Sequence, residues 1–232
     1  MPDHRYPQFC PTARAAEILG ERWTLLIARE LLCGPQRFTD LRRRLPGISS
    51  SLLTERLGRL EERGLVARRE APPPAPATLY ELTALGATLR PVLLELMRFG
   101  VRFIDPPRPG DHLEPDWMRL ALVAFARRGP TPARRFAVRV PDEARHVEIH
   151  VTGGRRGTTV RDGAGAADVS LRAAPLALLG LVSGGVDPEA ALAGGQIEAE
   201  GDRAALRDLP ALFDLSTLLA RPEEANVSNP NG

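Results

Sequence analysis

The chain has 232 residues, of which 43% are hydrophobic and 26% charged, and its longest apolar runs fall short of the ~18 residues that a membrane-spanning helix needs. This composition excludes an integral membrane protein and fits a globular chain of one large or two ordinary domains. The net charge of +2 hides an asymmetry, because residues 1–104 contain 16 arginines and 11 acidic residues, whereas residues 105–232 contain 15 arginines and 18 acidic residues. A basic first half favours a nucleic-acid partner there and a different task for the second half.

The N-terminal segment lacks the features of a secretory signal. Residues 1–9 are polar and interrupted by Pro2 and Pro7, so a cytoplasmic location is expected. The two cysteines, Cys10 and Cys33, are too few for a disulfide framework and do not have the C-x-x-C spacing of a metal site. The sequence therefore predicts neither a metal nor a cofactor.

The first half reads as a helical domain with a β-hairpin. Helical periodicity and stop signals predict helices over 12–19, where Thr12 is the expected cap, over 23–32 and over 39–45. Ser49 or Ser50 then caps a longer helix that ends at Gly64 and in which Leu53, Leu57 and Leu60 recur at core spacing. Residues 65–70 and 78–82 read as two strands joined by a proline-rich tip, which is the wing of a winged helix-turn-helix.

A further helix is predicted from Thr83 to Phe99, and its many apolar residues require a partner surface. The proline-rich run that follows marks a domain boundary, because proline cannot continue a helix and stiffens a linker. We therefore expect a first domain at 1–104, a linker at 105–112, a second domain at 113–220 and a disordered tail at 221–232.

In the second half of the chain, the spacing of apolar residues changes from a helical period to the alternation of β-strands. A helix over 116–127 is followed by strands near 136–140, 147–151, 157–161 and 169–171, by helices from Pro175 and Pro188, by a strand over 196–200 and by a closing helix over 206–213. This order predicts an α+β fold: a winged helix-turn-helix domain followed by a domain in which a meander sheet carries helices on one face.

Short polar side chains at the start of the long helix are suited to reading DNA. A recognition helix meets base edges near its N-terminus, while arginines on neighbouring elements bind phosphates. The candidate readers on the helix are Ser49, Ser50, Ser51, Thr54, Glu55 and Arg59, and the candidate phosphate contacts are Arg42, Arg43, Arg44, Arg68 and Arg69. The alternative is an ordinary solvated helix with scattered arginines.

A resemblance favours the first interpretation. Gly20-Glu21-Arg22-Trp23, Leu45-Pro46-Gly47-Ile48-Ser49, Leu53-Thr54-Glu55-Arg56-Leu57 and Tyr80-Glu81-Leu82-Thr83 resemble the HxlR family of winged-helix regulators over about residues 9–103. The resemblance implies a homodimer, paired through the N-terminal segment and the last helix of the domain, on an inverted-repeat operator in double-stranded DNA. It also implies that Arg56 lies near the DNA backbone. One departure is that the wing tip, residues 71–77, contains no basic residue.

Cys10 directly precedes a predicted helix, and a helix N-terminus lowers the pKa of a thiol. Several HxlR-like regulators carry a redox- or electrophile-sensing cysteine at this place, so the resemblance suggests the same role for Cys10. The alternative is packing at the dimer interface. Cys33, in the last turn of an apolar helix, is expected to be buried and inert.

Residues 113–219 resemble the sterol carrier protein fold, chiefly through Val151-Thr152-Gly153-Gly154 and Asp187-Pro188-Glu189-Ala190-Ala191-Leu192. In that family an apolar tunnel holds an acyl chain or a sterol. The candidate lining residues are Phe125, Phe136, Leu176, Leu179, Leu206, Leu209 and Phe213. The alternative is that these side chains fill an ordinary core.

These patterns predict a DNA-binding transcriptional regulator, with repression as the expected effect, and not an enzyme, since no catalytic motif is recognised. Its expected partners are double-stranded DNA, a second copy of the chain and an apolar small molecule, with no membrane partner. One alternative is a lipid carrier or partner-binding protein that uses its helix-turn-helix for dimerisation alone. A thiol enzyme that depends on Cys10 is a third possibility.

Overall fold

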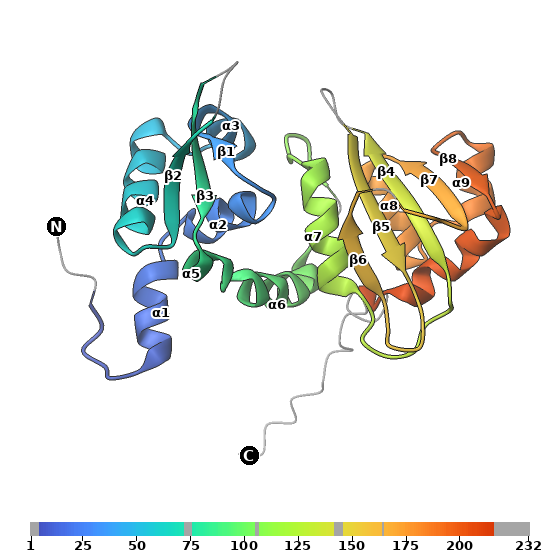
Figure 1. Cartoon of the computed structure of the whole chain (residues 1–232), viewed down its shortest axis with the longest axis horizontal. Helices are drawn as coiled ribbons and strands as arrows, with labels where there is room; N and C mark the ends of the chain where they lie inside the picture. The colour runs from blue at the N-terminus through green and yellow to red at the C-terminus, as the bar shows by residue number, and fades with distance from the viewer. Residues whose placement is uncertain (1–4, 72–75, 105–106, 142–145, 164, 216–232) are drawn as a thin grey trace, which may run out of the picture. The chain divides into compact units, whose positions relative to one another are not determined.

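The computed structural model describes residues 5–71, 76–104, 107–141, 146–163 and 165–215. Within these ranges the chain forms two compact units that divide between Leu93 and Leu94, and Figure 1 traces them from blue to red. The predicted linker lies later, at 105–112, and its described residues 107–112 belong to no helix or strand. The tail at 221–232 lies outside the described residues, so its predicted disorder stays a prediction.

Four helices form the body of the first unit: α1 (Pro11–Leu19), α2 (Thr24–Leu32), α3 (Phe38–Arg44) and α4 (Ser50–Glu62). The leucines predicted to face the core do so, because Leu53, Leu57 and Leu60 are each at most 3% exposed and pack with Ile27 and Leu41. The predicted cap of α1, Thr12, lies two positions after the observed one. Cys10 occupies the N-cap position, and Pro11 at the first helical position fixes the start of the helix.

The wing is a small antiparallel sheet. β2 (Val66–Glu70) pairs with β3 (Thr78–Leu82), and β3 also pairs with the two-residue strand β1 (Gln36–Arg37), which had not been predicted. Residues 72–75 of the proline-rich tip lie outside the described residues. The first strand of the hairpin, β2, begins soon after the end of α4 at Glu62, as in a winged helix-turn-helix.

The helix predicted from Thr83 to Phe99 is broken. Thr83 caps α5 (Ala84–Ala87) by accepting a hydrogen bond from the Gly86 amide at 3.0 Å, and a second helix, α6 (Arg90–Gly100), follows after the break. A short 3₁₀ helix, η1 (Val101–Phe103), extends α6. The break falls where α5 packs closely on the base of the wing, since a Cβ atom at Gly86 would lie 2.0 Å from the Leu65 carbonyl oxygen.

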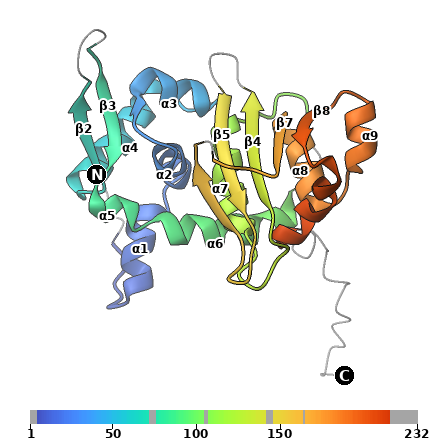
Figure 2. The same cartoon turned by 45° about the vertical axis from the view of Figure 1, so that its right-hand side comes forward.

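The second unit is a five-stranded sheet with helices on one face. The strands are β4 (Arg135–Pro141), β5 (His146–Thr152), β6 (Thr159–Asp162), β7 (Val169–Ala173) and β8 (Ile197–Gly201), in the order β6-β5-β4-β7-β8. Burial alternates along the strands, and the buried side chains share one core with α7 (Pro115–Phe125) and α8 (Pro175–Ser183). Figures 1 and 2 show both helices on the same side of the sheet, so the predicted α+β class is confirmed.

The sheet departs from a simple meander at its fourth strand. β4, β5 and β6 form antiparallel neighbours, but β7 crosses back to pair with β4 in parallel, and β8 then adds to β7. The short helix α9 (Pro188–Ala193) lies between α8 and β8. The closing helix is the 3₁₀ helix η2 (Arg203–Leu212), which contains Pro210, and not an α-helix.

Candidate nucleic-acid interface

The start of α4 is fixed by a serine cap. Ser49 has extended backbone angles, and its hydroxyl accepts a hydrogen bond from the Leu52 amide at 3.2 Å, while Ser49 Oγ and Ser51 Oγ lie 3.1 Å apart. A side-chain oxygen at this position satisfies an amide that the helix itself leaves unpaired. Ser49 thus sets where the helix begins, and its hydroxyl is already engaged in doing so.

The side chains that follow the cap are exposed. Ser50, Ser51, Thr54 and Glu55 are all exposed, on the side of α4 that its buried leucines leave open. Arg42 of α3 donates a hydrogen bond to Ser50 Oγ at 2.9 Å. The structure therefore brings together a predicted base reader and a predicted phosphate contact at one end of the helix-turn-helix.

Two predicted DNA contacts, Arg56 and Arg59, belong to an ionic cluster centred on Glu21. Arg56 lies 2.9 Å from the Glu21 carboxylate and 3.0 Å from Glu55, and it donates to the Arg22 carbonyl at 3.3 Å. Arg59 pairs with Glu21 and, at 2.8 Å, with Glu55. The Arg56 side chain is 14% exposed, and its contacts with Glu21 and the Arg22 carbonyl link α4 to the turn before α2. Sequence reasoning missed Glu21, which lies 38 residues from Arg59.

The wing arginines are exposed but paired. Arg68 lies 2.7 Å from Glu61, and its guanidinium sits 5.4 Å from the centre of the Tyr80 ring. The hydrogen bond to Glu61, followed by the charge interactions with Tyr80 and Glu61, raises the pKa of Arg68 above its ordinary value. Arg69 lies 2.9 Å from Glu81 on the neighbouring strand. Phosphates would have to compete with these carboxylates.

The three consecutive arginines of α3 differ in exposure. Arg42 and Arg43 are exposed, and with Phe38 and Thr39 they line a hollow of about 430 Å³. The expectation that Arg44 also meets phosphate is wrong, because Arg44 is 4% exposed and lies 3.5 Å from the fully buried Glu30. Arg44 ties α3 to α2 instead.

Cys10 occupies the N-cap position of α1 and is partly exposed. The backbone amides of Ala13 and Thr12, followed by the Thr12 side chain, hold the pKa of the Cys10 thiol below its ordinary value. The lowered pKa favours the thiolate, which is the nucleophilic form. Cys33 at the end of α2 is partly exposed, so the expectation that it is buried is wrong.

Most of the predicted ligand-lining side chains lie in the core of the second unit. Phe136, Leu206 and Phe213 are fully buried, and the same cluster contains Phe125 and Leu209. Leu179 is partly buried against this cluster, whereas Leu176 is 55% exposed and does not join it. Six of the seven candidates therefore share one apolar cluster.

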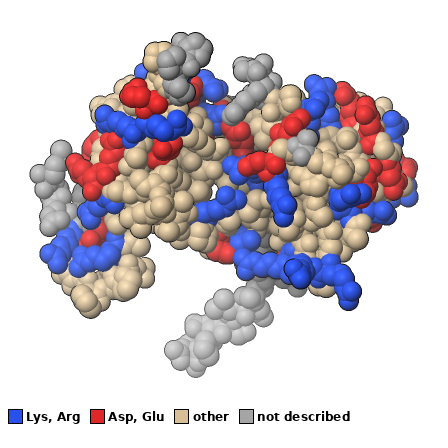
Figure 3. All heavy atoms as spheres, viewed as in Figure 1, with Lys and Arg blue, Asp and Glu red and all other residues tan. Residues whose placement is uncertain are grey.

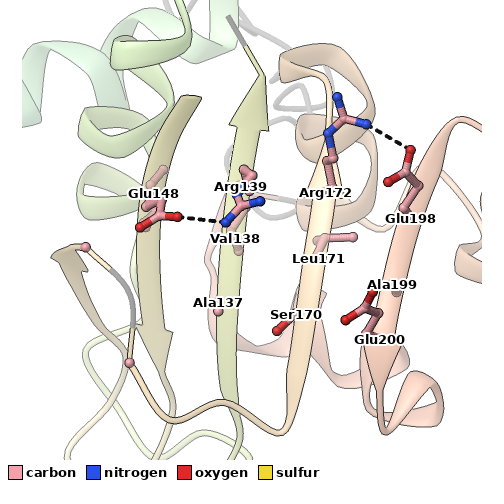
Figure 4. A pocket seen from close by; sticks show the side chains of 13 residues that line it. Ala137, Val138, Arg139, Glu148, Ser170, Leu171, Arg172, Glu198, Ala199 and Glu200 are labelled. Atoms are coloured by element: carbon pink, nitrogen blue, oxygen red, sulfur yellow. Dashed lines mark hydrogen bonds and ion pairs between the residues drawn. The ribbon is translucent and has the colours of Figure 1, made fainter. Parts of the chain in front are cut away.

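A hollow of about 340 Å³ lies on the opposite, helix-free face of the same sheet. Figure 4 shows its charged rim, where Arg139 pairs with Glu148 at 3.0 Å and Arg172 pairs with Glu198 at 2.9 Å. None of the seven predicted apolar lining residues belongs to it. Because charged side chains stand at its rim, this hollow suits an acyl chain or a sterol less well than a wholly apolar pocket would.

Within the described ranges, no three His, Cys, Asp or Glu side chains are grouped so that they could hold a metal ion. No helix among those residues is long and apolar enough to cross a membrane.

These features define the class of the first unit. A serine-capped helix with an exposed polar start, a preceding helix with exposed arginines and a following β-hairpin make a winged helix-turn-helix domain of the DNA-binding type.

Comparison with known proteins gives the family. Residues 18–108 match the HxlR-like helix-turn-helix model, and residues 124–214 match the SCP-2 sterol transfer family model. YvaP of Bacillus subtilis, an uncharacterized HTH-type transcriptional regulator, is 40% identical over 101 residues, which are 43% of this chain and 93% of YvaP. The chain belongs to the HxlR-like helix-turn-helix transcriptional regulators, and its second half is a domain of the SCP-2 type. Both resemblances predicted from sequence are confirmed.

Other relatives match the same first half. The HTH-type transcriptional regulator YodB of Bacillus subtilis is 36% identical over 98 residues, which are 42% of this chain and 88% of YodB. The solved structure of reduced YodB covers 44% of this chain and 100% of its own, with 34% identity and a TM-score of 0.37. YvaP and YodB are both named as HTH-type transcriptional regulators.

Proposed function

We propose that this regulator is a homodimeric repressor that binds an inverted-repeat operator in double-stranded DNA through α4. The observation that carries the proposal is the exposed group of Ser50, Ser51 and Thr54 at the start of α4, with Arg42 hydrogen-bonded to Ser50. Hydroxyls and the Glu55 carboxylate can bond to base edges, while Arg42 and its neighbours bind the backbone. In this assignment residues 1–104 read DNA and pair the two copies.

Exposed apolar side chains support the homodimer. Phe9, before α1, is fully exposed, and Phe99, Phe103 and Ile104 at the end of α6 and after it are each more than 60% exposed. The Phe99 and Phe103 rings contact each other with 5.1 Å between their centroids and are tilted by 51°. Exposed apolar side chains of this kind on one copy favour burial against another copy. The predicted dimer elements, the N-terminal segment and the last helix, carry these residues.

We further propose that residues 113–220 bind an apolar small molecule. The predicted lining side chains other than Leu176 lie in one buried cluster, so the ligand would enter by separating them. Such a ligand changes DNA binding if it has different affinities for two arrangements of the dimer. Oxidation of Cys10 is a second route to regulation, supported by its lowered pKa and partial exposure.

Binding of the purified chain to DNA from its own promoter tests the proposal. In a fluorescence-anisotropy titration, the double variant Ser51→Ala/Thr54→Ala should lose the preference for operator over scrambled DNA, because it removes exposed reading groups from α4. Ser170→Ala, which removes an exposed hydroxyl from the second unit, should bind like the wild type. A wild-type chain without sequence preference would overturn the proposal and favour the carrier alternative, which native mass spectrometry would support if the purified dimer retained a lipid.

A further inference from the structure

Two loops of the second unit are held together at one end of its sheet. The Thr158 amide donates to the Arg127 carbonyl at 2.8 Å, and the Gly154 amide donates to Thr131 Oγ1 at 2.8 Å. Gly157 has a positive φ of 105°, and a Cβ atom there would lie 2.5 Å from the Arg127 carbonyl oxygen. The loop after α7 and the loop between β5 and β6 therefore lie in close contact, and glycine is needed at the junction.

This junction gathers four arginines, Arg127, Arg128, Arg155 and Arg156, which we call the arginine corner. Arg155 and Arg156 are exposed, and within the described residues neither has an ion pair. Arg128 is 79% exposed and has one carboxylate at 3.2 Å, that of Glu95. Arg127 pairs with Asp214 at 3.0 Å. Figure 3 shows blue side chains gathered along the lower edge of the second unit, where these loops lie in Figure 1.

The corner stands out against its surroundings. Residues 105–232 contain more acidic residues than arginines, and most arginines of the second unit face a carboxylate, as Arg139 and Arg172 do on the open face of the sheet. Arg155 and Arg156 are neighbours in the sequence and have no such partner among the described residues, so their positive charges are free to attract an anion. The corner is thus the part of the second unit best suited to a partner with closely spaced negative charges.

The neighbouring residues favour a nucleic-acid backbone over a lipid surface. The two loops, residues 128–134 and 153–158, consist of Gly, Pro, Thr, Ala and Arg. They offer no large apolar or aromatic side chain to enter a bilayer, which a membrane-surface site normally provides. An arginine side chain can form two parallel hydrogen bonds to phosphate oxygens, and this contact does not require apolar side chains beside it.

We propose that the arginine corner is a second DNA contact that binds the phosphate backbone beside the operator without reading sequence. The inference rests on the proposed function of the first unit, which brings the chain to DNA. The corner adds affinity and salt dependence, while α4 supplies the sequence preference. Operator binding should then depend on the length of the flanking duplex.

The test compares the full-length variant Arg155→Gln/Arg156→Gln with a matched control, Arg139→Gln/Arg172→Gln, which removes two paired arginines elsewhere on the same sheet. Affinity is titrated against salt on a minimal operator and on one extended by roughly 20 bp, about two helical turns, on each side. Losing two phosphate contacts in each copy, four in the dimer, should flatten the slope of log K against log salt by about 3.6 on the extended duplex. The minimal duplex and the control should behave like the wild type, and Arg155→Lys/Arg156→Lys should keep most of the slope.

Several outcomes would overturn the inference: an unchanged slope on the extended duplex, an equal change in the control, or arginine-dependent binding to phosphatidylserine vesicles without any effect on DNA. Circular dichroism melting of each variant checks that it is folded, and the lysine pair retains the charge where glutamine disturbs folding. The proposed function fails separately, by loss of sequence preference in the wild type. The corner would still be measurable in that case, because its contribution should appear on scrambled extended duplex as well.

Discussion

The buried pair between Glu30 and Arg44 predicts a large and asymmetric loss of stability when either charge is removed. Glu30 is fully buried, with Arg29 at 2.7 Å and Arg44 at 3.5 Å, and Arg44 itself is 4% exposed. Glu30→Gln leaves two arginines without the buried carboxylate between them. Breaking a buried ion pair in this way costs about 3–5 kcal/mol of unfolding free energy. Arg44→Met should cost less, because Arg29 still neutralises Glu30.

The double variant Glu30→Leu/Arg44→Met should recover much of this loss, since apolar groups of similar volume often replace a buried pair at little cost. Denaturant unfolding followed by the fluorescence of Trp23 measures these effects in the full chain. Trp23 packs against the core of the first unit, and Trp117→Phe removes the tryptophan of α7. A two-state loss of stability should move the midpoint without changing the slope m.

A double-mutant cycle of Glu30→Leu, Arg44→Met and the double variant Glu30→Leu/Arg44→Met decides the outcome. We expect a coupling energy of at least about 1 kcal/mol, as found for residues in direct contact. A loss below about 1 kcal/mol for Glu30→Gln is the value of an exposed pair and would refute the reasoning. So would a double variant whose loss equals the sum of the two single losses. Because Arg44 holds α3 to α2, the destabilised variants should also lose operator binding at lower temperature than the wild type.

Three further predictions concern single positions. In a background without Cys33, the rate at which Cys10 reacts with iodoacetamide should rise with a pH midpoint below about 8.5, the ordinary thiol pKa, because nearby backbone amides lower the pKa of Cys10. A midpoint at or above about 8.5 would contradict the sensing role. Hydrogen bonds from Arg135 lower the pKa of Asp168. The stabilisation by the Asp168 carboxylate is therefore present above its unfolded pKa of about 3.9 and is lost as the pH falls through the lower folded pKa. The stability difference between wild type and Asp168→Asn should vanish in acid, and a difference independent of pH would disprove this prediction. Gly86→Ala should lower the melting temperature, because its Cβ atom would lie 2.0 Å from the Leu65 carbonyl oxygen. The control Gly58→Ala should be neutral or stabilising by up to about 1 kcal/mol, because a Cβ atom there would meet no heavy atom within 4 Å.

Local patterns predicted the elements whose causes are local. The leucine spacing of α4, its serine cap and the alternation of β4, β5 and β7 follow from residues close in sequence, and the structure has them nearly where the sequence predicts. The close approach of Gly86 in α5 to the Leu65 carbonyl is a contact across 21 positions, which local patterns do not reveal. The return of β7 to β4 likewise depends on packing between distant segments, which a strand period does not encode.

The same division applies to the candidate site. Exposure of Ser50, Ser51 and Thr54 follows from the helical period, because the leucines fix the buried side. The partners of the arginines could not be predicted, since Glu21 lies far from α4 in the sequence. Arg44 was wrongly predicted to contact phosphate for a related reason. Its position in a run of three arginines does not indicate that it pairs with the buried Glu30.

These pairings change what the arginines contribute to DNA binding. Arg56, Arg59, Arg68 and Arg69 each face a carboxylate in the absence of DNA. A phosphate that binds such an arginine must share it with the carboxylate or displace that group, and in either case a negative charge remains beside the DNA. The electrostatic gain is therefore smaller than the number of arginines suggests. If α4 binds an operator as proposed, its hydroxyls must supply a larger share of the affinity than they would beside unpaired arginines. Arg155 and Arg156, which have no carboxylate partner among the described residues, should then have a disproportionate effect on the salt dependence of binding.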